Sequence, residues 1–176
     1  MKKSLISFFL CILSLALLLT GCKNGLNLLP SKEAPGLQAP LHHDVSIQFG
    51  DFQGRASLSA ESYETFSLSF SEPQSMVGFS VKLENSVYRH EMNGLATEHK
   101  QDTMPSQDVA SLLFLPLRSV MKKEYTAASY KDGVWTYEGI VANSIYFVTQ
   151  NHETGELISL RIPQKQFEAN FLPPTA

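Results

Sequence analysis

Apolar and polar side chains alternate along four runs in the first half of this 176-residue chain. The runs are residues 45–49, 55–59, 66–71 and 79–84. Successive side chains of a β-strand point to opposite faces, so the pattern indicates strands with one buried and one solvent-facing side. Gly50-Asp51, Glu84-Asn85 and Asn93-Gly94 are typical of tight turns between antiparallel neighbours. The first half therefore predicts an antiparallel meander of hairpins.

One later segment breaks this period of two. Apolar side chains recur there at three- and four-residue spacing, which is typical of an amphipathic helix; they are Val109, Leu112, Leu113, Leu117 and Val120. We expect Ser106 to cap the helix, and Asp108 to lie in its first turn, where the helix dipole favours a carboxylate. Pro116 lacks a backbone donor and clashes with the preceding turn. It should therefore kink or end the helix after about three turns.

Strand signals resume after the helix. They cover residues 125–130, 134–138, 145–148, 158–162 and 167–171, with a turn at Lys131-Asp132-Gly133. The run 145–148 is apolar on both faces, so we expect it to be central or covered by the helix. The prediction is an α+β domain over residues 42–172, followed by a tail at 173–176. Its curved antiparallel sheet of about ten strands, an open half-barrel, would wrap around one main helix.

Two segments resemble known patterns. Phe70-Ser71-Glu72-Pro73 followed by Met76-Val77-Gly78-Phe79 is similar to a strand pattern of uncharacterised lipoproteins of Firmicutes. Residues 153–162 resemble the late hairpin of the lipoprotein-carrier (Lol-type) fold, which implies an open half-barrel holding helix against its concave face. That family includes periplasmic lipoprotein carriers, an envelope-stress regulator and a clostridial germination lipoprotein. The resemblance implies an architecture more than a role, because one fold serves several functions.

The N-terminus is typical of an export signal. Lys2 and Lys3 precede an apolar run over residues 5–19, and the stretch that ends in Gly21-Cys22 resembles the lipobox of bacterial lipoproteins. The resemblance implies a signal peptide at residues 1–21, cleavage between Gly21 and Cys22, and diacylglycerol on the Cys22 sulfur. The alternative is an uncleaved signal anchor. A helix that spans a membrane needs about 20 apolar residues, and this run is shorter. We therefore expect a protein anchored to the lipid bilayer through Cys22, on the extracytoplasmic face of the cell membrane.

The residues after the cleavage site indicate a flexible tether, and the net charge of the remaining chain restricts the classes of binding partner. Residues 22–41 contain three prolines and two glycines and show no clear period, which is typical of a flexible linker. Without Lys2 and Lys3 the chain keeps 12 basic and 17 acidic side chains, a net charge of about −5. Such a surface argues against a nucleic acid partner. Cys11 leaves with the signal peptide, so no disulfide is expected.

Signatures of catalysis are missing from the sequence. The serines of the alternating runs fall on the solvent face, and none lies in a Gly-x-Ser-x-Gly elbow. His90-Glu91 and Glu98-His99 could face each other across the Asn93-Gly94 turn as a surface two-histidine site. We interpret them as solvated hairpin side chains. We therefore expect no enzyme activity, no cofactor and no metal.

The aromatic and methionine content leaves two interpretations open. These side chains are either plain core, or they line an apolar cleft for an acyl chain or a partner. The candidate lining residues are Phe66, Phe70, Phe79, Tyr88, Met92, Leu112, Leu113, Trp135 and Tyr137. The leading hypothesis is a lipoprotein that binds an envelope protein or a hydrophobic ligand in or on the half-barrel. One alternative is an accessory or stabilising subunit of a cell-wall or spore-cortex enzyme, and another is an unrecognised hydrolase.

Overall fold

A computed structural model describes residues 33–103 and 108–172 of the chain. The predicted signal peptide, Cys22, Ser106 and the tail 173–176 lie outside the described residues. One compact unit begins at Ala34 and contains everything described below. Within the described ranges, no helix has the length and apolar character that crossing a membrane requires.

The described residues form eleven strands, one α-helix and three short 3-10 helices. The strands are β1 (Leu41–Phe49), β2 (Phe52–Ser62), β3 (Thr65–Glu72), β4 (Phe79–Glu84), β5 (Val87–Met92), β6 (Leu95–Lys100), β7 (Ala127–Lys131), β8 (Val134–Val141), β9 (Ser144–Asn151), β10 (Leu157–Ile162) and β11 (Phe167–Phe171). The helices are η1 (Gln74–Met76), η2 (Gln101–Thr103), α2 (Val109–Met121) and η3 (Pro163–Lys165). The predicted combination of an antiparallel open sheet and one helix is confirmed, with eleven strands instead of about ten.

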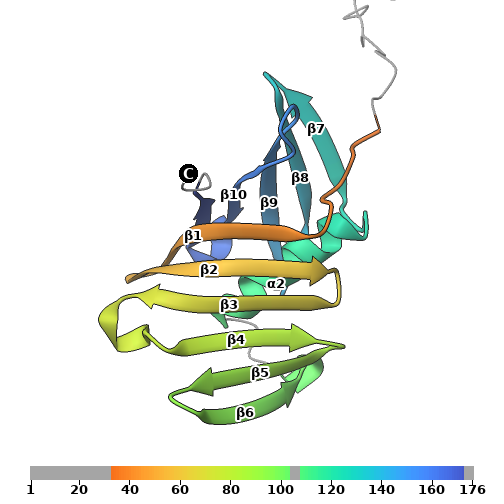
Figure 1. The fold of residues 1–176 in the computed structure, drawn as a ribbon. Coiled ribbons are helices and arrows are strands. Elements are labelled where there is room, and N and C mark those ends of the chain that lie inside the picture. The colour runs from red at the N-terminus through yellow and green to blue at the C-terminus, as the bar shows by residue number, and fades with distance from the viewer. Residues whose placement is uncertain (1–32, 104–107, 173–176) are drawn as a thin grey trace, which may run out of the picture. The chain divides into compact units, whose positions relative to one another are not determined.

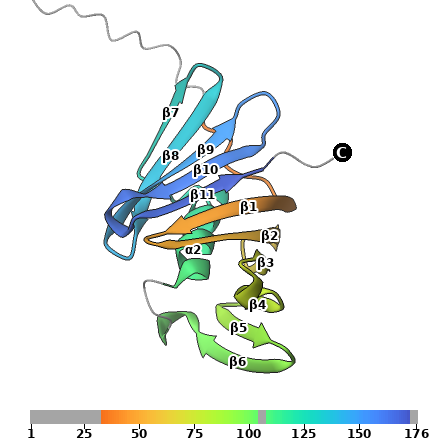
Figure 2. The same ribbon diagram turned by 90° about the vertical axis from the view of Figure 1, so that its left-hand side faces the viewer.

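All strands belong to one antiparallel sheet, in the order β6-β5-β4-β3-β2-β1-β11-β10-β9-β8-β7 (Figure 1). The first six strands form the expected meander from the centre to one edge, and the last five return from the opposite edge. The chain between β6 and β7 must therefore cross the whole sheet, and α2 lies on this crossing (Figure 2). A flat sheet of this size would be about 48 Å wide, but a helix of 13 residues spans only about 20 Å. The sheet bends around it, so that β2 to β6 and β7 to β9 run in different directions in Figure 1.

Two-residue turns join several neighbouring strands as the turn residues predict, although the turn predicted at Glu84-Asn85 lies at Asn85-Ser86. Asn93 and Gly94 have φ values of 51° and 82°, and Asp132 and Gly133 have 50° and 82°. Two consecutive residues in this left-handed region form the turn that matches the twist of a two-residue hairpin. Ala142 also adopts a positive φ of 48°, although alanine does not signal such a turn in a sequence. The turn between β8 and β9 was therefore not predicted.

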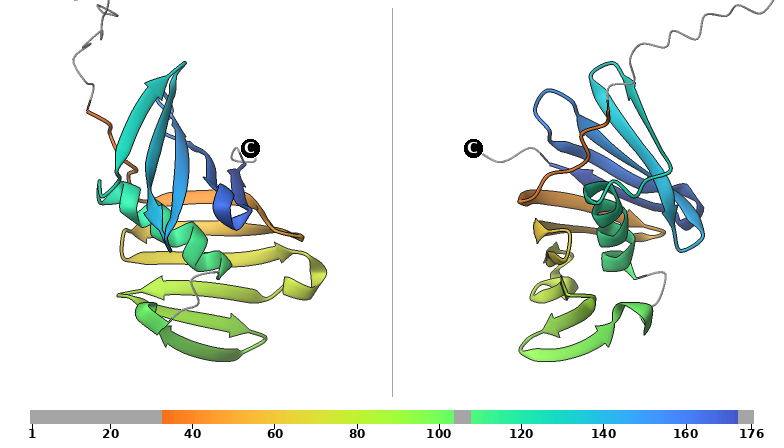
Figure 3. Two further views of the ribbon diagram at one scale, coloured as in Figure 1. Left: turned by 180° about the vertical axis from the view of Figure 1, so that it is seen from behind. Right: turned by 90° about the vertical axis from the view of Figure 1, so that its right-hand side faces the viewer.

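Helix α2 begins later than the sequence predicted. Asp108 is its N-cap and accepts a hydrogen bond from the Ser111 backbone N–H at 3.0 Å, so the predicted cap at Ser106 is wrong. The helix continues through Pro116 to Met121, so the proline does not end it, and the alternative of a kink stays a prediction. Pro116 is buried against the core, where tertiary packing outweighs the missing backbone hydrogen bond. Figure 3 shows the helix lying across the concave face of the sheet.

The C-terminal end of α2 is fixed to the sheet by a buried tyrosine. Tyr146 on β9 donates a hydrogen bond to Ser119 Oγ at 2.9 Å, and Ser119 Oγ donates to the Glu124 carbonyl at 2.7 Å. Gly139 pairs with Tyr146, and a Cβ at residue 139 would overlap the tyrosine ring. In the run 145–148, Tyr146 and Val148 are buried and β9 contacts the helix, as expected, whereas Ile145 on the other face is 37% exposed. Burial raises the pKa of Tyr146 because the phenolate would lose its hydration.

The folded unit starts before the predicted boundary at residue 42. Ala34 and Leu37 are buried in the core. Gly36 has a φ of 71°, and a Cβ there would lie 3.1 Å from the Val120 carbonyl oxygen on the helix. The predicted tether over 22–41 is therefore wrong for its last part, because these residues pack against α2. The prolines were typical of a linker, but the burial of Ala34 and Leu37 favours a packed segment.

Candidate functional site

The predicted cleft residues separate into three groups, and the first lies beneath α2. Phe66, Tyr88, Leu112 and Leu113 are almost completely buried. Phe114 of the helix stacks on Phe66 and on Tyr88, with ring centroids 5.2 Å and 6.2 Å apart. These side chains fill the concave face under the helix. Their packing is that of a core.

The second group lies on β8, in the other half of the sheet. Trp135 Nε1 donates to His152 Nδ1 at 3.2 Å, and the Trp135 ring lies 5.2 Å from that of Tyr130. Tyr137 donates to Gln150 Oε1 at 2.8 Å. Burial raises the pKa of Tyr137 to about 12 because the phenolate would be desolvated, and a hydrogen bond with the Gly36 backbone offsets only part of this effect. Trp135 and Tyr137 thus form a separate aromatic cluster.

The third group, Phe70, Phe79 and Met92, lies on β3 to β5. Phe70 and Phe79 belong to a continuous row of aromatic rings on the inner face of β2 to β6. Successive rings lie 6.2, 5.8, 6.0 and 5.7 Å apart. The aromatic row consists of Phe52, Phe70, Phe79, His90 and His99. Each ring comes from a different neighbouring strand, so the row crosses the sheet from near its centre to the β6 edge. Distances of this size are typical of interacting aromatic pairs.

The apolar surface beside the row becomes more exposed toward the edge. Phe79, Met92 and Leu95 occupy one cross-strand line on β4, β5 and β6. Phe79 is partly buried, Met92 is 37% exposed and Leu95 is 81% exposed. Every residue of β6 is exposed, and within the described ranges no strand pairs with its outer edge. Large apolar side chains are therefore adjacent to unpaired backbone groups.

Polar groups near the row are incompletely satisfied. His90 Nε2 lies 3.9 Å from Asp108 Oδ1, at the N-cap of α2. Tyr88 Oη, His90 Nδ1 and Ser111 Oγ are buried and have no hydrogen-bond partner among the described residues. Buried polar atoms without partners are uncommon in native proteins and are candidates for contact with a ligand or water. Burial raises the pKa of Tyr88 because the phenolate would lose its hydration.

The sequence also raised the hypothesis that the two histidines of the β5–β6 hairpin form a surface metal site. His90 and His99 do come together, with ring centroids 5.7 Å apart in an edge-to-face arrangement. They do so as members of the aromatic row. Within the described part of the chain, no cluster of three or more His, Cys, Asp or Glu side chains is arranged to hold a metal ion.

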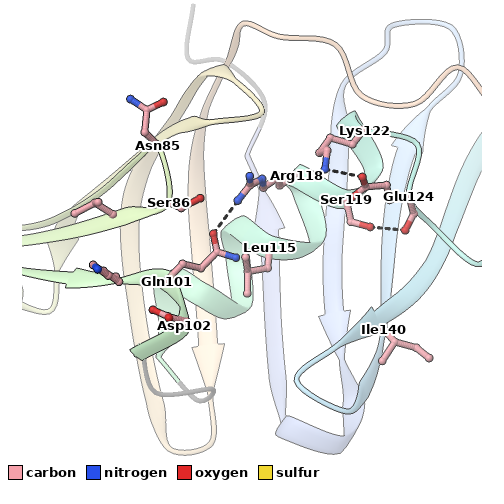
Figure 4. A pocket seen from close by; sticks show the side chains of 12 residues that line it. Asn85, Ser86, Gln101, Asp102, Leu115, Arg118, Ser119, Lys122, Glu124 and Ile140 are labelled. Carbon is pink, nitrogen blue, oxygen red and sulfur yellow. Dashed lines mark hydrogen bonds and ion pairs between the residues drawn. The ribbon is translucent and has the colours of Figure 1, made fainter.

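A polar groove follows the outward side of the helix (Figure 4). Its volume is about 860 Å³, and it is lined by Asn85, Ser86, Val87, Lys100, Gln101, Asp102, Leu115, Arg118, Ser119, Lys122, Glu124 and Ile140. None of the predicted cleft residues is among them. The sequence did not reveal this groove because its walls come from the β4–β5 turn, the end of β6 and the helix, which are distant in the chain.

Comparisons with known proteins assign no family. No protein-family model matches the chain, and none of the curated proteins matches it. Among solved structures, the chain is similar to a LolA superfamily protein from Nitrosomonas europaea, with 12% sequence identity and a TM-score of 0.38. The match covers 73% of this chain and 65% of that protein, so the chain spans slightly less than two thirds of its length. The resemblance to the Lol-type fold therefore stays a prediction.

Proposed function

We propose that this protein is a membrane-tethered binding protein that captures an extended apolar segment of another protein at the aromatic row and β6. The observation that carries the proposal is that the row crosses five strands and ends at β6, with whose outer edge no strand of the described ranges pairs. The backbone of such a segment would pair with β6, and one of its alternate apolar side chains would lie beside Leu95, in line with Met92.

The exposed edge strand supports the backbone part of this proposal. Proteins usually protect edge strands with proline, with bulges or by covering them. Strand β6 contains no proline, pairs with β5 without a bulge over all six residues, and is fully exposed. Its charged side chains, Glu98 and Lys100, are the protection that this edge does have. An added strand would satisfy its outward N–H and C=O groups.

The apolar surface supports the side-chain part. Leu95 is the most exposed large apolar side chain among the described residues, and it lies opposite Met92 in the register. Clustered apolar side chains at a surface mark interaction sites more often than scattered ones do. The partly buried Phe79 supports this patch from β4.

The packing beneath α2 favours a protein segment over an acyl chain. Leu112 and Leu113 fill the space in which an enclosed lipid would have to lie. An acyl chain could enter there only if the helix moved away from the sheet. The edge site needs no such movement, because Met92 and Leu95 are already exposed.

The location of this function rests on the lipobox-like stretch before Cys22. Two acyl chains on one sulfur would anchor the domain stably, since a single chain binds membranes only marginally. A partner would then be another protein of the cell envelope. The accessory-subunit hypothesis is one form of this function.

Photocross-linking in intact cells tests the proposal. The full chain is produced with the photoreactive residue p-benzoylphenylalanine in place of Leu95, and a control carries it in place of Ile158, which is exposed on β10. We expect a discrete protein adduct from position 95 that disappears when Met92→Ser is added. Equal adducts from both positions, or an adduct to lipid alone from position 95, would contradict a protein partner at this edge.

A further inference from the structure

We propose that the polar groove beside α2 is a second binding site, for a ligand that carries a phosphate or carboxylate group. The groove is separate from the aromatic row. Its volume of about 860 Å³ lies within the range of small-molecule sites in proteins, about 300–1,000 Å³.

Positive charge is concentrated in this groove although the chain as a whole is acidic. Lys100, Arg118 and Lys122 all line it, and they come from the end of β6 and from the helix. Two carboxylates, Asp102 and Glu124, also line it. The net formal charge of the lining is therefore positive, in contrast to the net charge of −3 for the whole chain.

The carboxylates leave two of the three cations unneutralised. Lys122 Nζ pairs with Glu124 Oε1 at 2.5 Å. No carboxylate oxygen of the described residues lies within 4.0 Å of the charged nitrogens of Lys100 or Arg118. Arg118 is only partly exposed, and a cation in such a position is stabilised by an anionic partner, which a ligand can provide.

Arg118 is held in a position suited to such a ligand. Its Nη1 donates to Gln101 Oε1 at 2.8 Å, and its side chain is only partly exposed. Gln101 is neutral, so this bond orients the guanidinium without cancelling its charge (Figure 4). A guanidinium has five N–H donors in a planar arrangement, and the free ones can bind two oxygens of a phosphate or carboxylate.

The uncharged residues that line the groove indicate the chemistry of the part of the ligand attached to its anionic group. Asn85 and Ser86 supply polar groups from the β4–β5 turn, and Leu115 and Ile140 supply apolar contacts. Ile140 is one of the most exposed apolar side chains of the described residues. The lining therefore suits an anionic head group attached to a small polar and partly apolar body. Such a group can belong to a soluble metabolite or to the head of a membrane lipid.

Calorimetric titration of the full chain in neutral detergent micelles tests this site. One arm adds glycerol 3-phosphate, and the other adds lysophosphatidylglycerol, with lysophosphatidylcholine, a zwitterion without net charge, as the comparison. We expect at least one anionic probe to bind, with affinity that falls as salt rises. Arg118→Gln and Lys100→Gln should each weaken it about tenfold, as the loss of a charge-assisted contact predicts.

The matched control is Arg161→Gln, because Arg161 is exposed on β10 and does not line the groove. It should bind the probe like the unaltered chain. Lys100→Gln changes an exposed side chain, so it tests the site even if Arg118→Gln impairs folding. Binding of lysophosphatidylglycerol alone would identify a lipid source, and binding of glycerol 3-phosphate would identify a soluble one. Absence of binding by both anionic probes, or equal binding by all variants, would overturn the proposal.

This test is independent of the proposed partner site. Met92→Ser should leave anion binding unchanged, because Met92 is not part of the groove. Failure of either site would therefore leave the other proposal standing.

Discussion

Phe79 stacks on His90 across β4 and β5, with ring centroids 6.0 Å apart and ring planes only 16° from parallel. The two residues are diagonal neighbours, since Phe79 pairs with Met92 and His90 pairs with Val81. Diagonal positions on one sheet face lie within reach of aromatic side chains. This contact continues the phenylalanines of β2, β3 and β4 into the two histidines of β5 and β6, and so extends the aromatic row to the edge.

Packing of α2 on the sheet should dominate the stability of the domain. Leu113 is completely buried, so Leu113→Ala should lower the free energy of unfolding by about 2–5 kcal/mol. Leu112→Ala should act similarly. Urea unfolding measures the effect, with Leu95→Ala as the exposed control, expected to change stability by less than about 0.5 kcal/mol. Unaltered unfolding of both helix variants would mean that α2 does not pack as described.

Tyr137 should make the domain sensitive to alkali. Its pKa is raised from 10.0 to about 12, so the folded state favours the neutral phenol. The stability that Tyr137 contributes is fully present below pH 10 and decreases as the pH rises toward 12. The free energy of unfolding should therefore fall less steeply over this range in Tyr137→Phe than in the unaltered protein. Parallel curves for the two proteins would contradict the desolvated, hydrogen-bonded phenol.

His43 should make the stability of the domain sensitive to acid. Burial lowers the pKa of His43 from its ordinary value of 6.5, and the opposing charge of Glu156 only partly offsets this. The unfolded chain then takes up a proton at residue 43 first, so stability is lost as the pH falls below 6.5. His43→Gln should reduce this loss, and His42→Gln should reduce it less, because the charge of His42 is the smallest of the three influences on the pKa of His43. Equal effects of the two variants in urea unfolding would argue against a buried His43.

Alternation and turn residues predicted the strands well where one face is buried. Val45 and Ile47 are buried, whereas Gln48 is exposed, as their spacing requires. The pattern cannot mark β6, because all its side chains are exposed. It also cannot show that Leu37 packs on the core, because an isolated apolar residue among prolines has no period.

Only part of the candidate binding surface could be predicted from the sequence. Phe70, Phe79 and Met92 were identified as apolar candidates, but their grouping with His90 and His99 depends on register across strands. Register is fixed by turns and by the bulges between β2 and β3, which no local pattern encodes completely. Trp135 was placed in the same cleft on composition alone, and it lies in the other half of the sheet.

Lipidation at Cys22 stays a prediction that one substitution can test. Cys22→Ala removes the sulfur that would carry diacylglycerol, so the variant should retain its signal peptide or be released into the medium. Metabolic labelling with a palmitate analogue, followed by separation of membrane and medium, measures both outcomes. Ser4→Ala serves as the control because it leaves the lipobox-like stretch unchanged. Continued labelling of the Cys22→Ala protein would contradict the lipoprotein interpretation.

Amide hydrogen exchange of β6 tests the central claim most directly. Short random peptides are selected for binding to the full chain in detergent, and exchange is then followed with and without a selected peptide. An added strand should slow exchange of the outward β6 amides, enrich peptides with alternating apolar residues, and lose affinity in Met92→Ser but not in Ile158→Ser. Unchanged exchange at β6, with protection appearing only on other strands, would contradict the edge as the binding site.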